Sequence, residues 1–137
     1  MGGGPVTTEL AEQDAVPTDG PDPAEQALAD LLTVLDTCLG ELEAARTRAR
    51  KLLTARRTGQ PWLQIVTTES RPLVVEQISA VMAALATAGG AWRREQAHAL
   101  QSEQVSINRI AALFGVTRQR ISALLRERAQ SRAGAEA

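Results

Sequence analysis

The sequence is poor in cysteine, histidine and aromatic residues. Its 137 residues include one Cys, one His, one Phe, two Trp and no Tyr. Cys38 has no partner for an internal disulfide, and Cys38 with His98 is too small a set for a zinc site. We therefore expect a reducing compartment, no disulfide scaffold, no metal site and no cofactor.

The scarcity of aromatic residues also bears on the fold. With 44% hydrophobic residues the chain can form a modest core, and that core must consist mainly of Leu, Ile, Val and Ala. Ala and Leu favour helices, whereas strands favour β-branched and aromatic residues. The composition therefore predicts an all-α protein.

Signals for export or membrane insertion are missing as well. The first ten residues, "MGGGPVTTEL", lack the basic and apolar blocks of a secretory signal. The most apolar window, Leu73 to Ala91, contains Glu76 and Gln77 and ends in Gly89-Gly90, which indicates a core helix rather than a membrane span. We expect a cytoplasmic protein without a membrane partner.

Net charge is only -1, but the charges are segregated along the chain. Residues 1–45 carry ten acidic and no basic side chains, and residues 46–57 carry six basic and no acidic ones. Residues 91–137 hold eight Arg against four Glu. This distribution indicates a basic C-terminal part that faces an anion, and an acidic part that faces elsewhere.

Four segments are predicted. Residues 1–21 are rich in Gly, Pro and acids and should form a disordered acidic tail. Residues 22–90 should form a helical dimerisation or interaction segment, and residues 91–130 a DNA-binding domain for the reasons given below. Residues 131–137 should be a flexible tail.

A long helix is expected at the start of the second segment. Asp22 suits its N-cap and Pro23 its first position, and Gly59 and Pro61 give stop signals after about Arg57. Such a helix has about 35 residues and a length of about 50 Å. It is longer than a routine globular helix.

Leucines in this helix follow the 3.5-residue spacing of a coiled coil. Two overlapping sets give a wide apolar face that can contact more than one helix, although Gly40 and Arg46 weaken the pattern. The helix either packs only on its own chain or helps a homodimer to form, and we favour the homodimer. The expected dimerisation residues are Leu28, Leu31, Leu32, Leu35, Leu39 and Leu42.

Residues 60–70 are expected to form a short connector with one apolar turn against the long helix, made by Trp62, Leu63, Ile65 and Val66. Pro72 should open the next helix, and Gly89-Gly90 should end or hinge it. A separate helix is then expected over residues 91–103.

The last two helices are predicted from caps and a corner. Ser106 can cap a helix over residues 107–114, and Thr117 can cap a last helix from Arg118 to about Ala129. Gly115 between them suits a left-handed corner, and Ala111 is small enough for a close helix crossing. Apolar core positions flank the corner at Ile110, Phe114, Val116, Ile121 and Leu124.

The segment "INRIAALFGVTRQRISALL" resembles the helix-turn-helix of bacterial transcriptional regulators. Within it, "FGVTRQRI" is similar to region 4 of the primary sigma factors, with resolvase-type helix-turn-helices as a second relative. An Ala- and Arg-rich composition with one Lys resembles that of actinobacterial proteins. Nothing upstream resembles the sigma segments that open promoters. The resemblance implies a three-helix DNA-binding domain but no particular target sequence.

Side-chain chemistry on the last helix agrees with DNA binding. If Ile121, Leu124 and Leu125 turn inward, a polar set turns outward, and Arg pairs well with guanine and Gln with adenine. The expected base-reading residues are Arg118, Gln119 and Ser122. The expected backbone contacts are Asn108, Arg109, Thr117, Arg120 and Arg126, with added attraction from Arg93, Arg94 and Arg128.

These patterns favour a homodimeric regulator that binds double-stranded DNA at an inverted repeat, with half-sites about one helical turn, ~34 Å, apart. An alternative is an adaptor whose long helix docks on a protein partner such as RNA polymerase or a signalling protein. An enzyme is the weakest class, because no nucleophile and base, phosphate-binding glycine loop or acidic metal cluster is recognisable. No catalytic residue is predicted.

Overall fold

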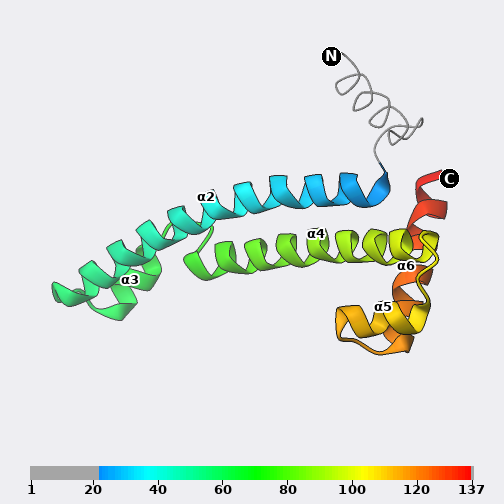
Figure 1. Ribbon diagram of the computed structural model, residues 1–137. Helices are drawn as coiled ribbons and strands as arrows, with labels where there is room; N and C mark the ends of the chain where they lie inside the picture. Colours follow the sequence, from blue (N-terminus) through cyan, green and yellow to red (C-terminus); the bar gives the residue numbers. More distant parts are fainter. Residues whose placement is uncertain (1–21, 137) are drawn as a thin grey trace, which may run out of the picture.

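The computed structural model describes residues 22–136, which contain five helices and no strand. The predicted tail over residues 1–21 lies outside this range. The helices are α2 (Pro23–Arg57), α3 (Trp62–Thr68), α4 (Val74–Ser102), α5 (Ile107–Phe114) and α6 (Arg118–Glu136). Figure 1 shows α2 and α4 side by side, α3 at one end of this pair, and α5 and α6 at the other. The all-α prediction is confirmed for the described residues.

The long N-terminal helix has the bounds that its capping residues predict. An oxygen of Asp22 accepts a hydrogen bond from the backbone N–H of Glu25 at 2.7 Å, and Pro23 occupies the first turn. The helix ends at Arg57, and Gly59 follows with a φ of 103°, a value that glycine adopts at low cost.

α2 packs antiparallel on α4 through small and medium-sized side chains. Cys38 and Ala45 of α2 and Val81 of α4 are buried, and the Cys38 Sγ lies 4.0 Å from the Val81 carbonyl oxygen. Other members of this α2 seam are half-buried and follow the same 3-4 spacing: Ala24, Ala27, Leu31 and Val34. Leu52 and Ala55 continue the spacing beyond the start of α4 and face α3. Small residues such as Cys38 and Ala45 allow two helices to approach closely.

The seam is displaced from the leucine stripe. Of the six predicted dimerisation residues, Leu31 is half-buried on the seam, while the other five remain exposed: Leu28, Leu32, Leu35, Leu39 and Leu42. α2 therefore carries two overlapping heptad patterns of apolar residues, and α4 covers only one of them.

The predicted connector contains a short helix of its own, α3. Of the four apolar residues expected to pack on the long helix, only Ile65 is buried, whereas Trp62, Leu63 and Val66 are exposed. The Trp62 ring lies over the Arg56 guanidinium of α2, at 5.3 Å, so the expected packing on the long helix is wrong for Leu63 and Val66, which are 77% and 59% exposed.

α4 begins at Val74 rather than at Pro72. The carboxylate of Glu69 accepts a hydrogen bond from the Val74 N–H at 2.7 Å, and Glu76 accepts one from the Leu73 N–H at 3.2 Å. These two acceptors satisfy free N–H groups of the first turn and set the start of the helix two residues later than predicted.

The predicted break at Gly89-Gly90 does not occur. α4 runs through both glycines to Ser102, so the helix expected over residues 91–103 is the second half of α4. Two glycines cost a helix about 1 kcal/mol each relative to alanine, and packing along α2 offsets that cost. The predicted boundary between residues 90 and 91 consequently falls inside one helix.

The C-terminal helices pack on the end of α4 around one core. Ser106 and Thr117 accept hydrogen bonds from the N–H groups of Arg109 and Arg120, at 3.2 and 3.1 Å, and so cap α5 and α6. Gly115 ends α5 with a φ of 68°. The core consists of Ala97, Ile110, Ala111, Ile121 and Leu124, with Phe114 and Val116 partly buried beside it. α6 continues to Glu136, well past the expected end near Ala129.

Replacing a core leucine should destabilise this end of the molecule. Leu124→Ala removes a side chain that is 1% exposed and should lower the free energy of unfolding by about 2–5 kcal/mol. Leu113→Ala, at a position that is 58% exposed on α5, is the matched control and should change it by less than about 1 kcal/mol. Chemical denaturation followed by circular dichroism measures both, and equal losses would contradict the described core.

Two glycine substitutions should have opposite effects. Gly115→Ala forces a Cβ into left-handed backbone and should cost about 1 kcal/mol, although no atom lies within 4 Å of that Cβ. Gly40→Ala in the middle of α2 also meets open space and should stabilise the protein by up to about 1 kcal/mol. Thermal unfolding of both variants tests the sign of each change in stability. A stabilising Gly115→Ala would contradict the left-handed backbone at Gly115.

Candidate nucleic-acid interface

The first turns of α6 present a polar face to solvent. Arg118, Gln119, Ser122 and Arg126 together line a shallow hollow of about 400 Å³. Arg118, Gln119 and Arg126 are exposed, and Ser122 is half-buried. All three residues predicted to read bases thus lie on one face of one helix, and Arg126 extends that face by a turn.

This face is held by the opposite side of the same helix. Ile121 and Leu124 are fully buried in the core shared with α4 and α5, and Leu125 packs partly against it. Rotation of α6 about its axis would expose these residues, so the orientation of Arg118 and Gln119 is set by packing rather than by their own contacts.

The residues predicted to contact a DNA backbone surround this face. Asn108 and Arg109 lie exposed in the first turn of α5, and Thr117 lies exposed at the cap of α6. The Thr117 hydroxyl already accepts a hydrogen bond from the backbone of Arg120. The Arg120 guanidinium lies 3.7 Å from Glu127, an exposed pair of little energetic weight.

One predicted DNA-attracting residue is engaged within the protein. The Arg128 Nε donates to both carboxylate oxygens of Glu95, at 3.0 and 3.3 Å, and each side chain is only 16% exposed. Arg128 therefore ties α6 to α4, and its attraction for DNA stays a prediction. Sequence spacing missed this pair because its members lie on different helices.

Arg93 and Arg94 also face the C-terminal helices. The Arg93 guanidinium lies 5.0 Å from the centre of the Phe114 ring, in the geometry of a cation–π contact. The Arg94 guanidinium lies 4.0 Å from Glu127. Both side chains help to join α4 to the end of the molecule that carries the candidate face.

The candidate face remains positively charged despite these pairs. Between residues 106 and 134, Glu127 is the only acidic side chain, against six arginines: Arg109, Arg118, Arg120, Arg126, Arg128 and Arg132. Within residues 22–134 no carboxylate forms an ion pair with Arg109, Arg118 or Arg126. These three guanidinium groups are available to an anionic ligand.

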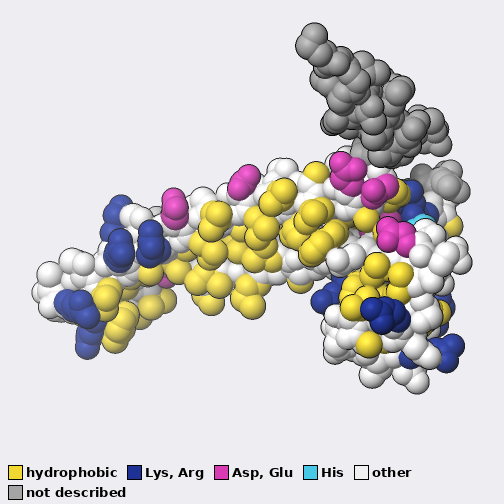
Figure 2. Space-filling model, viewed as in Figure 1, with side chains coloured by type: hydrophobic (Ala, Val, Ile, Leu, Met, Phe, Trp, Pro, Cys, Tyr) yellow, Lys and Arg dark blue, Asp and Glu magenta, His cyan; other side chains and the backbone are white. Residues whose placement is uncertain are grey.

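Basic side chains also gather at the far end of the molecule, and hydrophobic ones cover the middle (Figure 2). The far end comprises the last turns of α2 and the helix α3, where the Arg56 guanidinium lies 5.3 Å from the centre of the exposed Trp62 ring. Basic groups thus flank a middle part that carries hydrophobic side chains and, along one edge, acidic ones (Figure 2).

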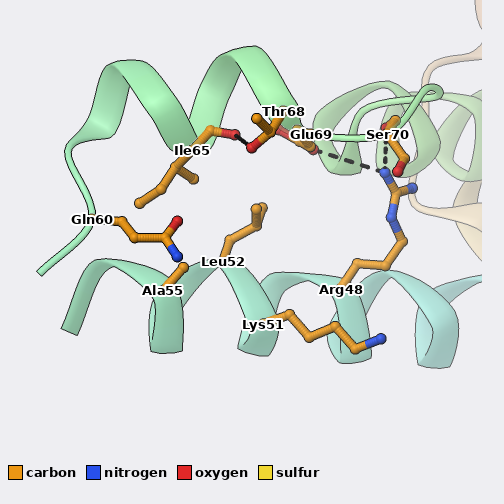
Figure 3. Close-up of a pocket in the computed structure, with 9 residues that line it drawn as sticks. All are labelled: Arg48, Lys51, Leu52, Ala55, Gln60, Ile65, Thr68, Glu69 and Ser70. Atoms are coloured by element: carbon orange, nitrogen blue, oxygen red, sulfur yellow. Dashed lines mark hydrogen bonds and ion pairs between the residues drawn. The ribbon is translucent and has the colours of Figure 1, made fainter. Parts of the chain in front are cut away.

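A cavity of about 240 Å³ lies between α2 and α3 at this far end (Figure 3). Leu52 and Ile65 face each other across it, and Arg48 closes one side. The Arg48 guanidinium donates to the Ser70 carbonyl and to Gln77 and lies 4.0 Å from Glu69. Arg48 thus holds the chain between α3 and α4 in place at the edge of this cavity.

Other kinds of site find little support among the described residues. Within residues 22–136, no three His, Cys, Asp or Glu side chains come together as metal ligands do. α4 has the length and composition that could cross a membrane, a property that core helices of soluble proteins share. No family model matches the chain, and no curated protein or solved structure does so either.

The link between α6 and α4 can be tested by a double-mutant cycle. Arg128→Met and Glu95→Gln should show a coupling energy of about 1 kcal/mol or more in the free energy of unfolding, because the pair is largely buried and shares two hydrogen bonds. The cycle of Arg120→Met with Glu127→Gln is the control and should give less than about 0.5 kcal/mol. Equal coupling in the two cycles would argue against the Arg128 link.

Proposed function

We propose that this protein is a sequence-specific transcriptional regulator that binds double-stranded DNA through a C-terminal helix-turn-helix formed by α5 and α6. The observation that carries the proposal is the two-sided character of α6. Its first turns expose Arg118 and Gln119 beside the half-buried Ser122, while Ile121 and Leu124 hold the helix in the core. A helix of this kind is suited to enter the major groove by its N-terminal end.

The exposed side chains have the chemistry of base reading. A guanidinium such as that of Arg118 can donate two hydrogen bonds to guanine O6 and N7, and the amide of Gln119 can pair with adenine N6 and N7. The Ser122 hydroxyl can donate or accept. Each bidentate pair discriminates between bases by about 1–3 kcal/mol.

Residues around this face are placed to hold the DNA backbone. In the proposed complex Asn108, Arg109 and Thr117 lie at the start of the two helices, where backbone N–H groups and side chains meet phosphates. Arg120 lies on a flank of α6, and Arg126 lies one turn beyond Ser122 on the same face. Their contribution should be salt-dependent and independent of sequence.

A homodimer is part of this proposal. The exposed leucines Leu28, Leu32, Leu35, Leu39 and Leu42 of α2 supply an apolar surface for it. Two reading heads related by a two-fold axis would read an inverted repeat, with half-sites about one helical turn, ~34 Å, or a multiple of it apart.

A second candidate function is that of an adaptor that docks on a protein such as RNA polymerase or a signalling partner. The exposed side chains of Trp62, Leu63 and Val66 beside the basic end of α2 favour it, because aromatic and basic residues are common at protein interfaces. Under this alternative, the chain binds its partner through α2 and α3 and needs no DNA.

DNA binding is tested by fluorescence titration with genomic fragments, followed by titration with a selected site and a scrambled control. The double variant Arg118→Ala, Gln119→Ala should bind the selected site at least about 100-fold more weakly and lose its preference over the scrambled DNA. Arg132→Ala, near the end of the same helix, removes an equal charge. It should weaken both DNAs alike and by less than about tenfold.

Unchanged affinity and unchanged preference in the double variant would refute the reading-head assignment. Binding that is lost equally for both DNAs would reduce the role of the two side chains to electrostatic attraction. No binding by the native protein to any fragment, together with capture of RNA polymerase, would favour the adaptor.

A further inference from the structure

A continuous apolar surface, here termed the hairpin face, covers one side of the α2–α4 pair. It comprises exposed large side chains on α2 (Leu28, Leu32, Leu35, Leu39 and Leu42) and on α4 (Val75, Ile78 and Met82). Figure 2 shows hydrophobic side chains spread over both helices on the side turned to the viewer.

Helix geometry explains why the two helices contribute to the same side. Leu39 and Leu42 come one and four residues after the buried Cys38, and Met82 comes one residue after the buried Val81. In an antiparallel pair, positions that follow the buried residue by one and four lie on the same side of both helices. The eight side chains therefore form one patch rather than two.

The patch is too large to be an ordinary solvent-exposed surface. The exposed fractions of its eight side chains, between 38% and 66%, correspond to on the order of 700 Å² of accessible surface. The largest apolar patch of a monomer is typically about 300–600 Å². A stable dimer buries about 800 Å² on each partner, so the hairpin face has the size that a second copy requires.

We propose that the hairpin face binds a second copy of this chain in antiparallel orientation, with Leu35 of α2 next to Leu35 of the other copy. The two pairs of helices would then form a four-helix bundle with a DNA-binding end at each extremity. This arrangement rests on the homodimer of the proposed function and requires no DNA. It extends the predicted dimer surface from α2 to α4.

Charge at the two ends of the leucine stripe favours one orientation. Residues 22–45 carry six acidic and no basic side chains, and residues 46–57 carry six basic and no acidic ones. In a register centred on Leu35, Arg46 of one copy lies level with residue 24 of the other, one residue from Glu25. A parallel pair would instead place Glu25 level with Glu25 and Arg46 level with Arg46, so these end pairs favour the antiparallel dimer.

The leucines of α2 are spaced symmetrically about Leu35. Leu28 and Leu42 lie seven residues on either side of it, and Leu32 and Leu39 lie three and four residues away. An antiparallel pair centred on Leu35 therefore places leucine against leucine along the whole stripe. The next side chains outward on this face are Glu25 and Arg46, which the same register brings within one residue of each other.

α4 offers a matching shape. A hollow of about 430 Å³ opens beside α4, with Leu85, Ala86, Gly89 and Gly90 in its wall. The contact between Cys38 and Val81 places Ala84 level with Leu35 in the antiparallel pair. Two-fold rotation about that level brings the other copy's Ile78 and Met82 to Gly90 and Ala86, two small residues in the wall of the hollow.

Disulfide trapping in full-length protein tests both the partner and the orientation. All variants carry Cys38→Ala, and mild oxidation is followed by non-reducing electrophoresis. Leu35→Cys should form a covalent dimer, because the two Cα atoms at the axis would lie within the ~4.4–6.8 Å that a disulfide spans. Leu28→Cys alone should form no covalent dimer, because residue 28 of one copy would lie about 20 Å from residue 28 of the other. An equimolar mixture of Leu28→Cys and Leu42→Cys should cross-link.

A second measurement protects the test against variants that fail to fold. Leu35→Glu should weaken dimerisation at least about 100-fold by light scattering, since it buries two unpaired carboxylates at the axis. Thr33→Glu, on the opposite side of α2, is the matched control and should remain dimeric. Circular dichroism should report the same helix content for both variants.

Two results would overturn the proposal. Cross-linking of Leu28→Cys with itself would show a parallel dimer, and a native protein that is monomeric at micromolar concentration would assign the hairpin face to another protein or to a lipid surface. Both measurements are made without DNA. A dimer that binds no DNA would leave this proposal standing and refute the DNA-binding function, and a monomer that binds DNA would do the reverse.

Discussion

The packing of Ala97 in one core with Ile110 and Ile121 is the contact on which the arrangement of the molecule depends. Ala97 belongs to α4, the same helix that packs along α2 through Val81, so one helix is shared by the long pair and the C-terminal helices. Its methyl side chain lets α5 and α6 approach the helix closely. Because the shared element is continuous, the orientation of the Arg118 face relative to α2 is set by two packed surfaces rather than by a linker.

Features governed by local chemistry could be predicted from the sequence. Asp22 and Pro23 mark the start of α2, because an N-cap acceptor and a missing N–H act within one turn. Gly115 adopts the left-handed corner that its lack of a Cβ favours, and Ile110 and Ile121 on either side of it are buried. The set Arg118, Gln119 and Ser122 shares one face for the same local reason, the periodicity of α6.

Features that depend on tertiary contacts could not be predicted in this way. Gly89 and Gly90 favour a break by their own propensity, and α2 packed along the helix overrides that preference. The hydrogen bond between Arg128 and Glu95 joins two helices, α6 and α4, and the sequence separation of these residues does not show that they are in contact. Two heptad patterns one residue apart were both visible in α2, and which of them faces α4 depends on the small side chains of Cys38 and Ala45.

The unbroken course of α4 through its two glycines makes it one continuous helix between the α2–α4 pair and the end of the molecule that carries Arg118 (Figure 1). Along an α-helix each residue adds about 1.5 Å of length and about 100° of rotation. The number of residues between Val81 and Ala97 thus determines the angle about the α4 axis at which the face with Arg118 lies. Inserting or removing one residue there would turn the Arg118 face by about 100° relative to the first half of α4 and would also shift the register of α4 on α2.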